Sequence, residues 1–296
     1  MTPSTRWLWL LRVTWLLLAV ASLPAYAGAL DGRSGAVQLV SATGLWIGWA
    51  IVLVATLVPS PPSLTVVRLL TPAAPVAAVV AAVAGAGAVA ATAAIALGAL
   101  AAIAAATAEV GWVFVQAAAY GDETRFLLRP PGPLVAGPLE LAWAALAATV
   151  GSGPLLLAAG QWLPGALVTA GAVALGVILA PRFHRLALRW FVFVPAGVVV
   201  RDPLVLTDTA MFRRADVQSL ALALADTTAA DLTARALGPA MEVDLAGRGT
   251  IAVGGPFVEE PEARSITIDG FLVSPSRPGR LLEEAQRRSY PVVVTN

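Results

Sequence analysis

The chain of 296 residues has no cysteine, no lysine and one histidine, His184. Without cysteine there is no disulfide, no thiolate nucleophile and no cysteine-ligated metal site. A single histidine cannot build a histidine-based metal site or a cysteine–histidine catalytic pair. The net charge of +1 gives no general attraction to nucleic acid. We therefore expect no metal, no other cofactor, no nucleic-acid partner and no catalytic residue.

Charge is also scarce in the first part of the chain. Residues 1–181 hold 11 charged side chains, whereas the last 115 residues hold 26, which are 13 acids and 13 arginines. Hydrophobic residues make up 58% of the chain, above the roughly 45–50% of soluble proteins. A bilayer-spanning helix needs roughly 20 consecutive apolar residues. The sequence therefore predicts a polytopic α-helical membrane domain over residues 1–181 and a soluble domain over residues 182–296.

Six transmembrane helices are expected from windows of about 20 residues. Their predicted ranges are 7–27, 40–59, 70–88, 91–118, 134–152 and 163–181. The motif Ala25-Tyr26-Ala27 has the form of a signal-peptidase site, but Arg12 interrupts the run that precedes it. We expect an uncleaved first span, and both interpretations place the segment after residue 27 outside.

The uncharged, alanine-rich stretch 71–107 allows two interpretations, one overlong helix or a hairpin near residues 85–92. With a hairpin, most arginines of the membrane half and its exit lie on one side of the membrane. They are Arg6, Arg68, Arg125, Arg129, Arg182, Arg185 and Arg189. By the positive-inside rule that side is cytoplasmic. We therefore expect both termini in the cytoplasm of a plasma (inner) membrane protein.

Two polar features of the membrane half are candidate sites. Glu109 lies either within the inner leaflet, where a carboxylate indicates a functional site, or at the membrane interface beside Trp112. The loop 120–133 is either a cytoplasmic docking loop facing the C-terminal domain or a partner, or a solvated connector stiffened by prolines. The docking residues would be Asp122, Glu123, Arg125 and Arg129.

After Pro181 the composition changes. Arg182, Arg185 and Arg189 are candidates for contact with anionic headgroups, although a role as positive-inside anchor accounts for this cluster by itself. Short β-branched runs between turn residues then predict strands, followed by a helix from about Ser276 to Arg288. The predicted strands are Arg189–Val194, Gly197–Arg201, Val205–Asp208, Met211–Arg213, Val217–Leu224, Met241–Leu245, Thr250–Val253 and Ser265–Leu272.

These runs carry a resemblance to known proteins. The segments 189–207, 211–214 and 216–219 resemble the opening strands of bacterial pleckstrin-homology-like (PH-like) domains. The whole chain resembles uncharacterised actinobacterial integral membrane proteins, through residues 57–68, 120–131, 231–238 and 276–282. The resemblance implies a small, mainly β, PH-like barrel with a C-terminal helix, and it implies no catalytic residue.

The expected function is that of a non-enzymatic membrane protein whose cytoplasmic PH-like domain binds a protein partner, a second copy or membrane lipid. The alternative is a small transporter or channel that uses Glu109, Gln116 and the Gly/Ala-rich third and fourth spans. A membrane enzyme with Asp122, Glu123 or Glu140 as base is a third alternative, and the spacing of these carboxylates does not support it.

Overall fold

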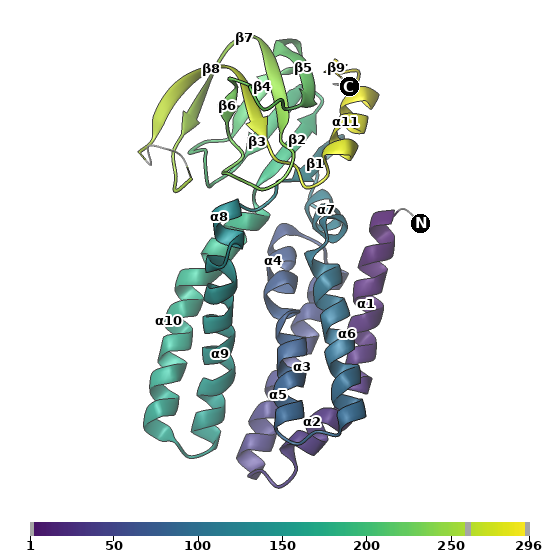
Figure 1. Ribbon diagram of the computed structural model, residues 1–296, viewed down its shortest axis with the longest axis vertical. Helices are drawn as coiled ribbons and strands as arrows, with labels where there is room; N and C mark the ends of the chain where they lie inside the picture. Colours follow the sequence, from purple (N-terminus) through teal and green to yellow (C-terminus); the bar gives the residue numbers. More distant parts are fainter. Residues whose placement is uncertain (1–2, 258–261, 294–296) are drawn as a thin grey trace. The chain divides into compact units, whose positions relative to one another are not determined.

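The computed structural model describes residues 3–257 and 262–293, which Figure 1 traces from purple to yellow. The chain divides into two compact units. The helical unit consists of the described residues up to Phe114 together with Glu140–Phe183, and the sheet unit consists of Val115–Leu139 and the described residues from His184 onward. The sequence prediction placed residues 115–139 with the membrane domain, whereas the structure builds them into the sheet unit.

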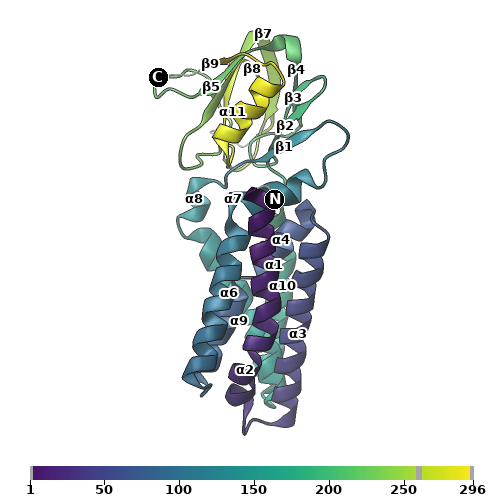
Figure 2. The ribbon, with the colours of Figure 1, turned by 90° about the vertical axis from the view of Figure 1, so that its right-hand side faces the viewer.

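The helical unit is a set of long apolar helices that run along a common direction (Figures 1 and 2). Its elements are α1 (Pro3–Ala21), α2 (Leu23–Leu30), α3 (Gly35–Leu57), α4 (Pro61–Leu70), α5 (Ala73–Val83), α6 (Ala88–Ala106), the start of α7 (Ala108–Gln116), most of α9 (Pro138–Ala158) and most of α10 (Trp162–Ala187).

Six helical segments in the described ranges are long and apolar enough to cross a membrane, as the sequence predicts. They are Thr5–Leu30, Gly35–Leu57, Pro61–Val83, Ala88–Ala106, Pro138–Ala158 and Trp162–Ala187. Two of these spans join adjacent helices, α1 with α2 and α4 with α5.

The hairpin interpretation of the stretch 71–107 is confirmed. Gly85 has φ +107°, a conformation that glycine adopts without the steric cost of a Cβ. The amide of Gly85 donates to Ala82 O at 3.2 Å and that of Ala86 to Ala81 O at 3.0 Å. This pair of bonds is a Schellman motif, which ends α5 and satisfies its last carbonyls.

The fourth span differs from the predicted range 91–118. Thr107 has an extended backbone (φ −61°, ψ 150°), so α6 ends at Ala106. The Thr107 hydroxyl accepts from the amide of Val110 at 3.3 Å and begins α7 as an N-cap. Arg68 donates to the freed carbonyls of Ala105 (3.3 Å) and Thr107 (3.4 Å). The break in the helix is therefore bridged by an arginine from α4.

Small residues and tryptophans determine how closely the helices approach each other. A Cβ on Gly98 of α6 would lie 2.8 Å from the backbone nitrogen of Pro75 on α5, which is the close contact that small residues allow in membranes. Between α1 and α3, Trp15 Nε1 donates to Trp49 O and Trp49 Nε1 donates to Trp15 O, both at 2.9 Å. The two indoles therefore join the helices through reciprocal hydrogen bonds.

The sheet unit contains two sheets and a C-terminal helix. The first sheet has the order β1-β2-β3-β4, with all pairs antiparallel, and the second has the order β6-β8-β7-β5-β9. The strands are β1 (Thr124–Leu127), β2 (Trp190–Val194), β3 (Gly197–Arg201), β4 (Ala210–Arg213), β5 (Val217–Leu222), β6 (Ala230–Asp231), β7 (Met241–Val253), β8 (Arg264–Val273) and β9 (Val292–Val293). Two sheets are present among the described residues, and they do not form one closed barrel.

One core lies between these elements. Phe191, Phe193, Val198 and Val200 of β2 and β3 are fully buried. The rings of Phe212 (β4) and Phe271 (β8) stack at 4.9 Å, joining the two sheets. The helix α11 (Pro278–Arg287; Figure 2) adds Leu281 and Ala285, also fully buried.

Several predicted strands are corrected. Segment 205–208 is not a strand, since only Leu206 forms an isolated bridge, to Val253. The two predicted strands 241–245 and 250–253 are one strand, β7, whose pairing with β8 is interrupted between Asp244 and Gly249. Gly247 and Gly249, which suggested a turn between two strands, lie at this irregularity within one strand. The strands β1, β6 and β9 were not predicted.

Candidate interaction site in the sheet unit

The loop predicted to dock supplies an edge strand of the first sheet. Thr124–Leu127 forms β1, which pairs antiparallel with β2 of the C-terminal segment (Figure 1). Phe126, Leu127 and Leu128 are 4%, 3% and 2% exposed. The loop is therefore not a solvated connector. Of the two interpretations that the sequence left open, the structure has the loop facing the C-terminal domain.

Gln116 covers the free side of β1. Its side-chain nitrogen donates to Glu123 O at 2.9 Å, and its side-chain oxygen accepts from the amide of Arg125 at 2.8 Å. These two bonds take the place of a neighbouring strand, because they satisfy edge groups that would otherwise be open to pairing. Both polar groups of the Gln116 side chain are therefore bonded to the backbone of the β1 segment. The transporter alternative had instead assigned Gln116 to a transport site.

Asp122 and Thr124 contact the end of α11. Arg288 Nη2 lies 3.0 Å from Asp122 Oδ1, and Arg288 Nε lies 2.6 Å from Glu284 Oε1. The Thr124 hydroxyl donates to Glu284 Oε1 at 2.9 Å. Glu284 is only 5% exposed. Burial raises the pKa of the Glu284 carboxyl, but the hydrogen bonds from Arg288 and Thr124 and the charges of Arg287 and Arg288 outweigh it, so the net shift is downward.

Glu123 pairs with Arg125 rather than with a catalytic partner. The two side chains form an ion pair at 2.9 Å. Burial raises the pKa of the Glu123 carboxyl, and the hydrogen bonds from Arg125 and the Tyr120 amide, with the charge of Arg125, turn the net shift downward. A carboxylate whose charged form is favoured in this way is a weak proton acceptor.

The prediction that Arg189 meets lipid headgroups is wrong. Its side chain and that of Asp202 are both 0% exposed and form an ion pair at 2.7 Å. Arg189 also donates to the carbonyl of Arg129 and, at 3.2 Å, to that of Thr233. A buried guanidinium needs such partners, and here they come from three segments distant in sequence. Arg182 and Arg185, by contrast, are exposed near the end of α10.

Arg129, whose carbonyl accepts from Arg189, makes further contacts with the C-terminal segment. Its amide donates to Ser274 O at 2.8 Å, and its guanidinium donates to the carbonyl of Pro239. Burial lowers the pKa of the Arg129 guanidinium. The four predicted docking residues therefore contact the C-terminal segment of the chain itself or each other.

A cluster of one tryptophan and two arginines was not foreseen. The guanidinium carbons of Arg125 and Arg201 lie 4.8 Å and 5.2 Å from the centre of the Trp190 ring, within the range of cation–π interaction. Trp190 Nε1 donates to Ala187 O at 2.7 Å. The alternation of side chains in the predicted strands 189–194 and 197–201 could have placed Trp190 and Arg201 on the same face of the sheet. Arg125 could not be added from the sequence, because it reaches Trp190 only through the unpredicted strand β1.

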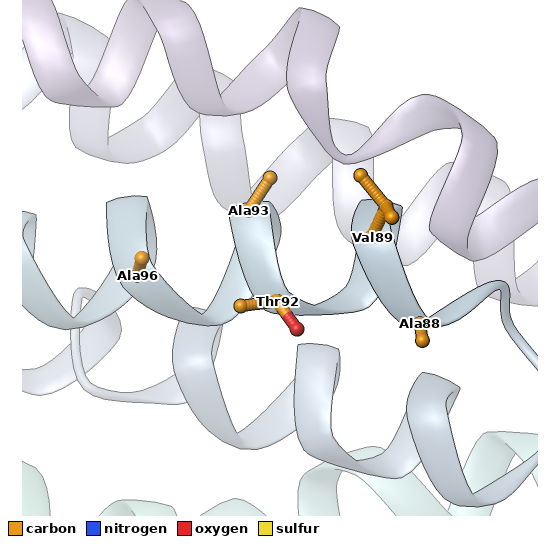
Figure 3. A pocket seen from close by; sticks show the side chains of 5 residues that line it. All are labelled: Ala88, Val89, Thr92, Ala93 and Ala96. Carbon is orange, nitrogen blue, oxygen red and sulfur yellow. The ribbon is translucent and has the colours of Figure 1, made fainter.

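In the helical unit, Glu109 lies half-buried in the first turn of α7, after the break at Thr107. A shallow hollow of about 460 Å³ lies on α6, and Figure 3 shows the side chains that line it. It is lined by Ala88, Val89, Thr92, Ala93 and Ala96. Thr92 brings the one polar side chain of this group, and Glu109 is not part of it.

No metal centre is formed by the part of the chain that the structure describes, where no three His, Asp or Glu side chains gather as ligands. Comparison of the chain with models of protein families, with curated proteins and with solved structures gives no match.

Proposed function

We propose that this chain is a non-enzymatic membrane protein that holds a PH-like interaction domain at the cytoplasmic face of the plasma membrane. The observation that carries the proposal is the origin of β1. It is supplied by the segment between the fourth and fifth candidate spans and pairs with β2 after the sixth. A domain built from two segments, each continuous with candidate spans, is held at the membrane at more than one point.

The PH-like assignment is supported by the order of elements in the sheet unit. After α10, the antiparallel meander β2-β3-β4, which β1 extends at its edge, is followed by the strands β5 to β8 of the second sheet, by the helix α11 and by the short strand β9. The resemblance of segments 189–207, 211–214 and 216–219 to opening strands of PH-like domains agrees with this order. The expected role of such a domain is to bind a protein segment, a second copy of the chain or lipid.

The orientation is tested by cysteine labelling, which the cysteine-free chain allows. Ser34, Gln161 and Gln218 are exposed and are each replaced by cysteine, then probed with a membrane-impermeant maleimide on intact cells. Labelling at Ser34→Cys and Gln161→Cys but not at Gln218→Cys is expected. Labelling at Gln218→Cys on intact cells contradicts a cytoplasmic sheet unit.

The interaction role is tested with a photo-crosslinking residue at exposed positions of the sheet unit, such as Leu224 and Leu237 (55% and 71% exposed). In the full chain in cells, a discrete protein adduct or a dimer of the chain is expected. An adduct-free pattern at every tested position, with lipid-linked products absent as well, contradicts the proposal.

The transporter alternative rests on the break in the fourth span, because interrupted helices line ion and substrate sites in transporters. Arg68 already occupies the carbonyls at this break. If Glu109→Gln and Glu109→Ala leave ion flux into proteoliposomes at the level of the unaltered chain, this alternative loses its charged residue.

A further inference from the structure

The second sheet has one face in the core and one outward face. On the core face, Phe271 of β8, Val243 of β7 and Leu220 of β5 lie opposite one another and are fully buried. Because side chains alternate along a strand, the residues next to these point outward. The register places the outward residues in two rows. One row crosses all five strands and consists of Asp231, Leu272, Glu242, Ala221 and Val293, and the other consists of Gly270, Asp244 and Ser219.

This outward face carries three carboxylates and no arginine in either row. Asp231 is exposed, and Glu242 and Asp244 are half-buried. Each accepts a hydrogen bond from a neutral group, which is a backbone amide for Asp231 (2.7 Å) and a hydroxyl for Glu242 (2.6 Å) and Asp244 (2.5 Å). In residues 3–257 and 262–293, none of the three forms an ion pair. Their negative charge is therefore not neutralised within the described part of the chain.

The exposed part of the first sheet carries the opposite charge. Its outward face is buried over β2, where Trp190 and Val192 are 7% and 5% exposed. The same face is open over β3 and β4, where Arg201, Met211 and Arg213 are exposed. In the strand register, Met211 lies between the positions of the two arginines. Neither arginine forms an ion pair with a carboxylate of the described residues, so both guanidinium groups keep donors available for an anion.

These two faces cannot meet within one copy of the chain. The rings of Phe212 on β4 and Phe271 on β8 stack between the two sheets, so the outward faces point away from a shared core. Both faces also carry an apolar side chain among their charges, Val293 (50% exposed) on the acidic face and Met211 (55% exposed) on the basic one. Opposite charges set the partner and the register of a contact, and apolar burial adds affinity. The faces therefore complement each other between two copies.

We propose that the acidic outward face of the second sheet binds the exposed arginines of the first sheet, Arg201 and Arg213, in a second copy of this chain. This rests on the proposed function and names a second copy as the partner of the interaction domain. Each copy offers two different faces, so the contact is heterologous. Repeated contacts of this kind build a ring or a row of copies.

The test uses the full chain, in which the absence of native cysteine allows one cysteine to be placed on each face. Two differently tagged copies, one with Met211→Cys and one with Val293→Cys, are reconstituted together in proteoliposomes and treated with a short, membrane-permeant bismaleimide. A cross-linked product that carries both tags is expected. In the matched control, Leu237→Cys replaces Val293→Cys. Leu237 is 71% exposed and lies on neither face, so this pair should give about tenfold less product.

Charge reversal tests the electrostatic match. Glu242→Arg together with Asp244→Arg, in the copy with its cysteine on β9, should lower the yield of product about tenfold, because like charges then lie opposite each other. Arg201→Glu together with Arg213→Glu, in the copy with its cysteine on β4, should have the same effect. Combining the two altered copies should restore the product, which also shows that both remain folded.

Equal product from the Val293→Cys and Leu237→Cys copies overturns the proposal, and this comparison decides by itself if a charge-reversed variant does not fold. A dominant product between two Met211→Cys copies, which indicates an isologous contact, also overturns it. So does unrestored cross-linking when both reversed variants keep their thermal unfolding transition. Absence of self-association together with an adduct to another protein overturns only this inference. A wrong cysteine-labelling pattern on intact cells overturns the proposed function independently.

Discussion

Arg189 and Asp202 form an ion pair in which neither side chain is exposed to solvent, with Arg189 Nε 2.9 Å from both carboxylate oxygens. Asp202 also accepts from the amide of Leu204 at 3.1 Å. The pair therefore joins the start of the C-terminal segment to the turn after β3. Through the carbonyls of Arg129 and Thr233, Arg189 reaches two further segments.

Removal of one partner should be more damaging than removal of both. Asp202→Ala leaves a buried guanidinium without its counter-charge, a change that costs about 3–5 kcal/mol in other proteins. The double variant Arg189→Met, Asp202→Leu should recover most of that loss. Denaturant unfolding of the purified full chain measures both. A single variant no less stable than the double one would contradict a structural role for the pair.

The contact between α11 and the 115–139 segment should weaken in acid. The folded-state pKa of Glu284 is lowered from 4.5, so its carboxylate stabilises the fold at pH values above 4.5, and this stabilisation is lost as the pH falls through the lower folded-state value. Glu284→Gln should be less stable than the unaltered chain at neutral pH and should approach it in acid. Unfolding free energy measured against pH checks this, and parallel curves for the two proteins would refute it.

The bidentate contact of Gln116 should protect β1. Gln116→Ala removes two hydrogen bonds at the strand edge, each with a net worth of about 0.5–1.5 kcal/mol. The amide of Arg125 should then exchange with solvent faster by one or more orders of magnitude. Hydrogen exchange resolved at residues 123–127 measures this. The exposed Gln218 serves as the matched control, and equal exchange in Gln116→Ala and Gln218→Ala would be evidence against the strand-edge role.

Gly98 should tolerate no larger side chain. A Cβ there would lie 2.8 Å from Pro75 N and 3.2 Å from Ala74 C, and backbone atoms cannot move aside as a flexible side chain does. Gly98→Ala should lower the thermal stability of the chain in detergent by several degrees. Gly44→Ala, where nothing lies within 4 Å, should be neutral or stabilising, because alanine favours a helix. If both variants behave alike, the α5–α6 contact is not as close as described.

The C-terminal segment should not fold without the loop between the fourth and fifth spans. A fragment from His184 onward lacks β1, whose Phe126 and Leu127 are buried, and so exposes β2 as an open edge. The fragment should aggregate or show no cooperative unfolding, whereas residues 115–139 linked to its N-terminus should restore a cooperative transition. Circular dichroism measures the unfolding transition of each fragment. Cooperative unfolding of the fragment alone would show that the C-terminal segment folds without β1, against this prediction.

Much of the architecture follows from local sequence. Six candidate spans are evident because apolar length alone decides whether a helix can cross a bilayer. The turn between α5 and α6 is set by Gly85, whose positive φ a short local motif requires. The strands β2 and β3, on either side of a tight turn, have bounds within a residue of the predicted ones, since their alternation and turn are local signals.

The candidate site required the tertiary structure. The four residues of β1 carry too weak a pattern to be distinguished from a loop, and their partner β2 begins more than sixty positions later. For the same reason, the sequence grouped Arg189 with Arg182 and Arg185 by spacing, although Asp202 and the carbonyls of Arg129 and Thr233 hold it in the core. Composition and periodicity determined the six candidate spans and the longer strands of the C-terminal segment. Long-range pairing alone decided that Arg189 is buried in the sheet unit while Arg182 and Arg185 stay exposed.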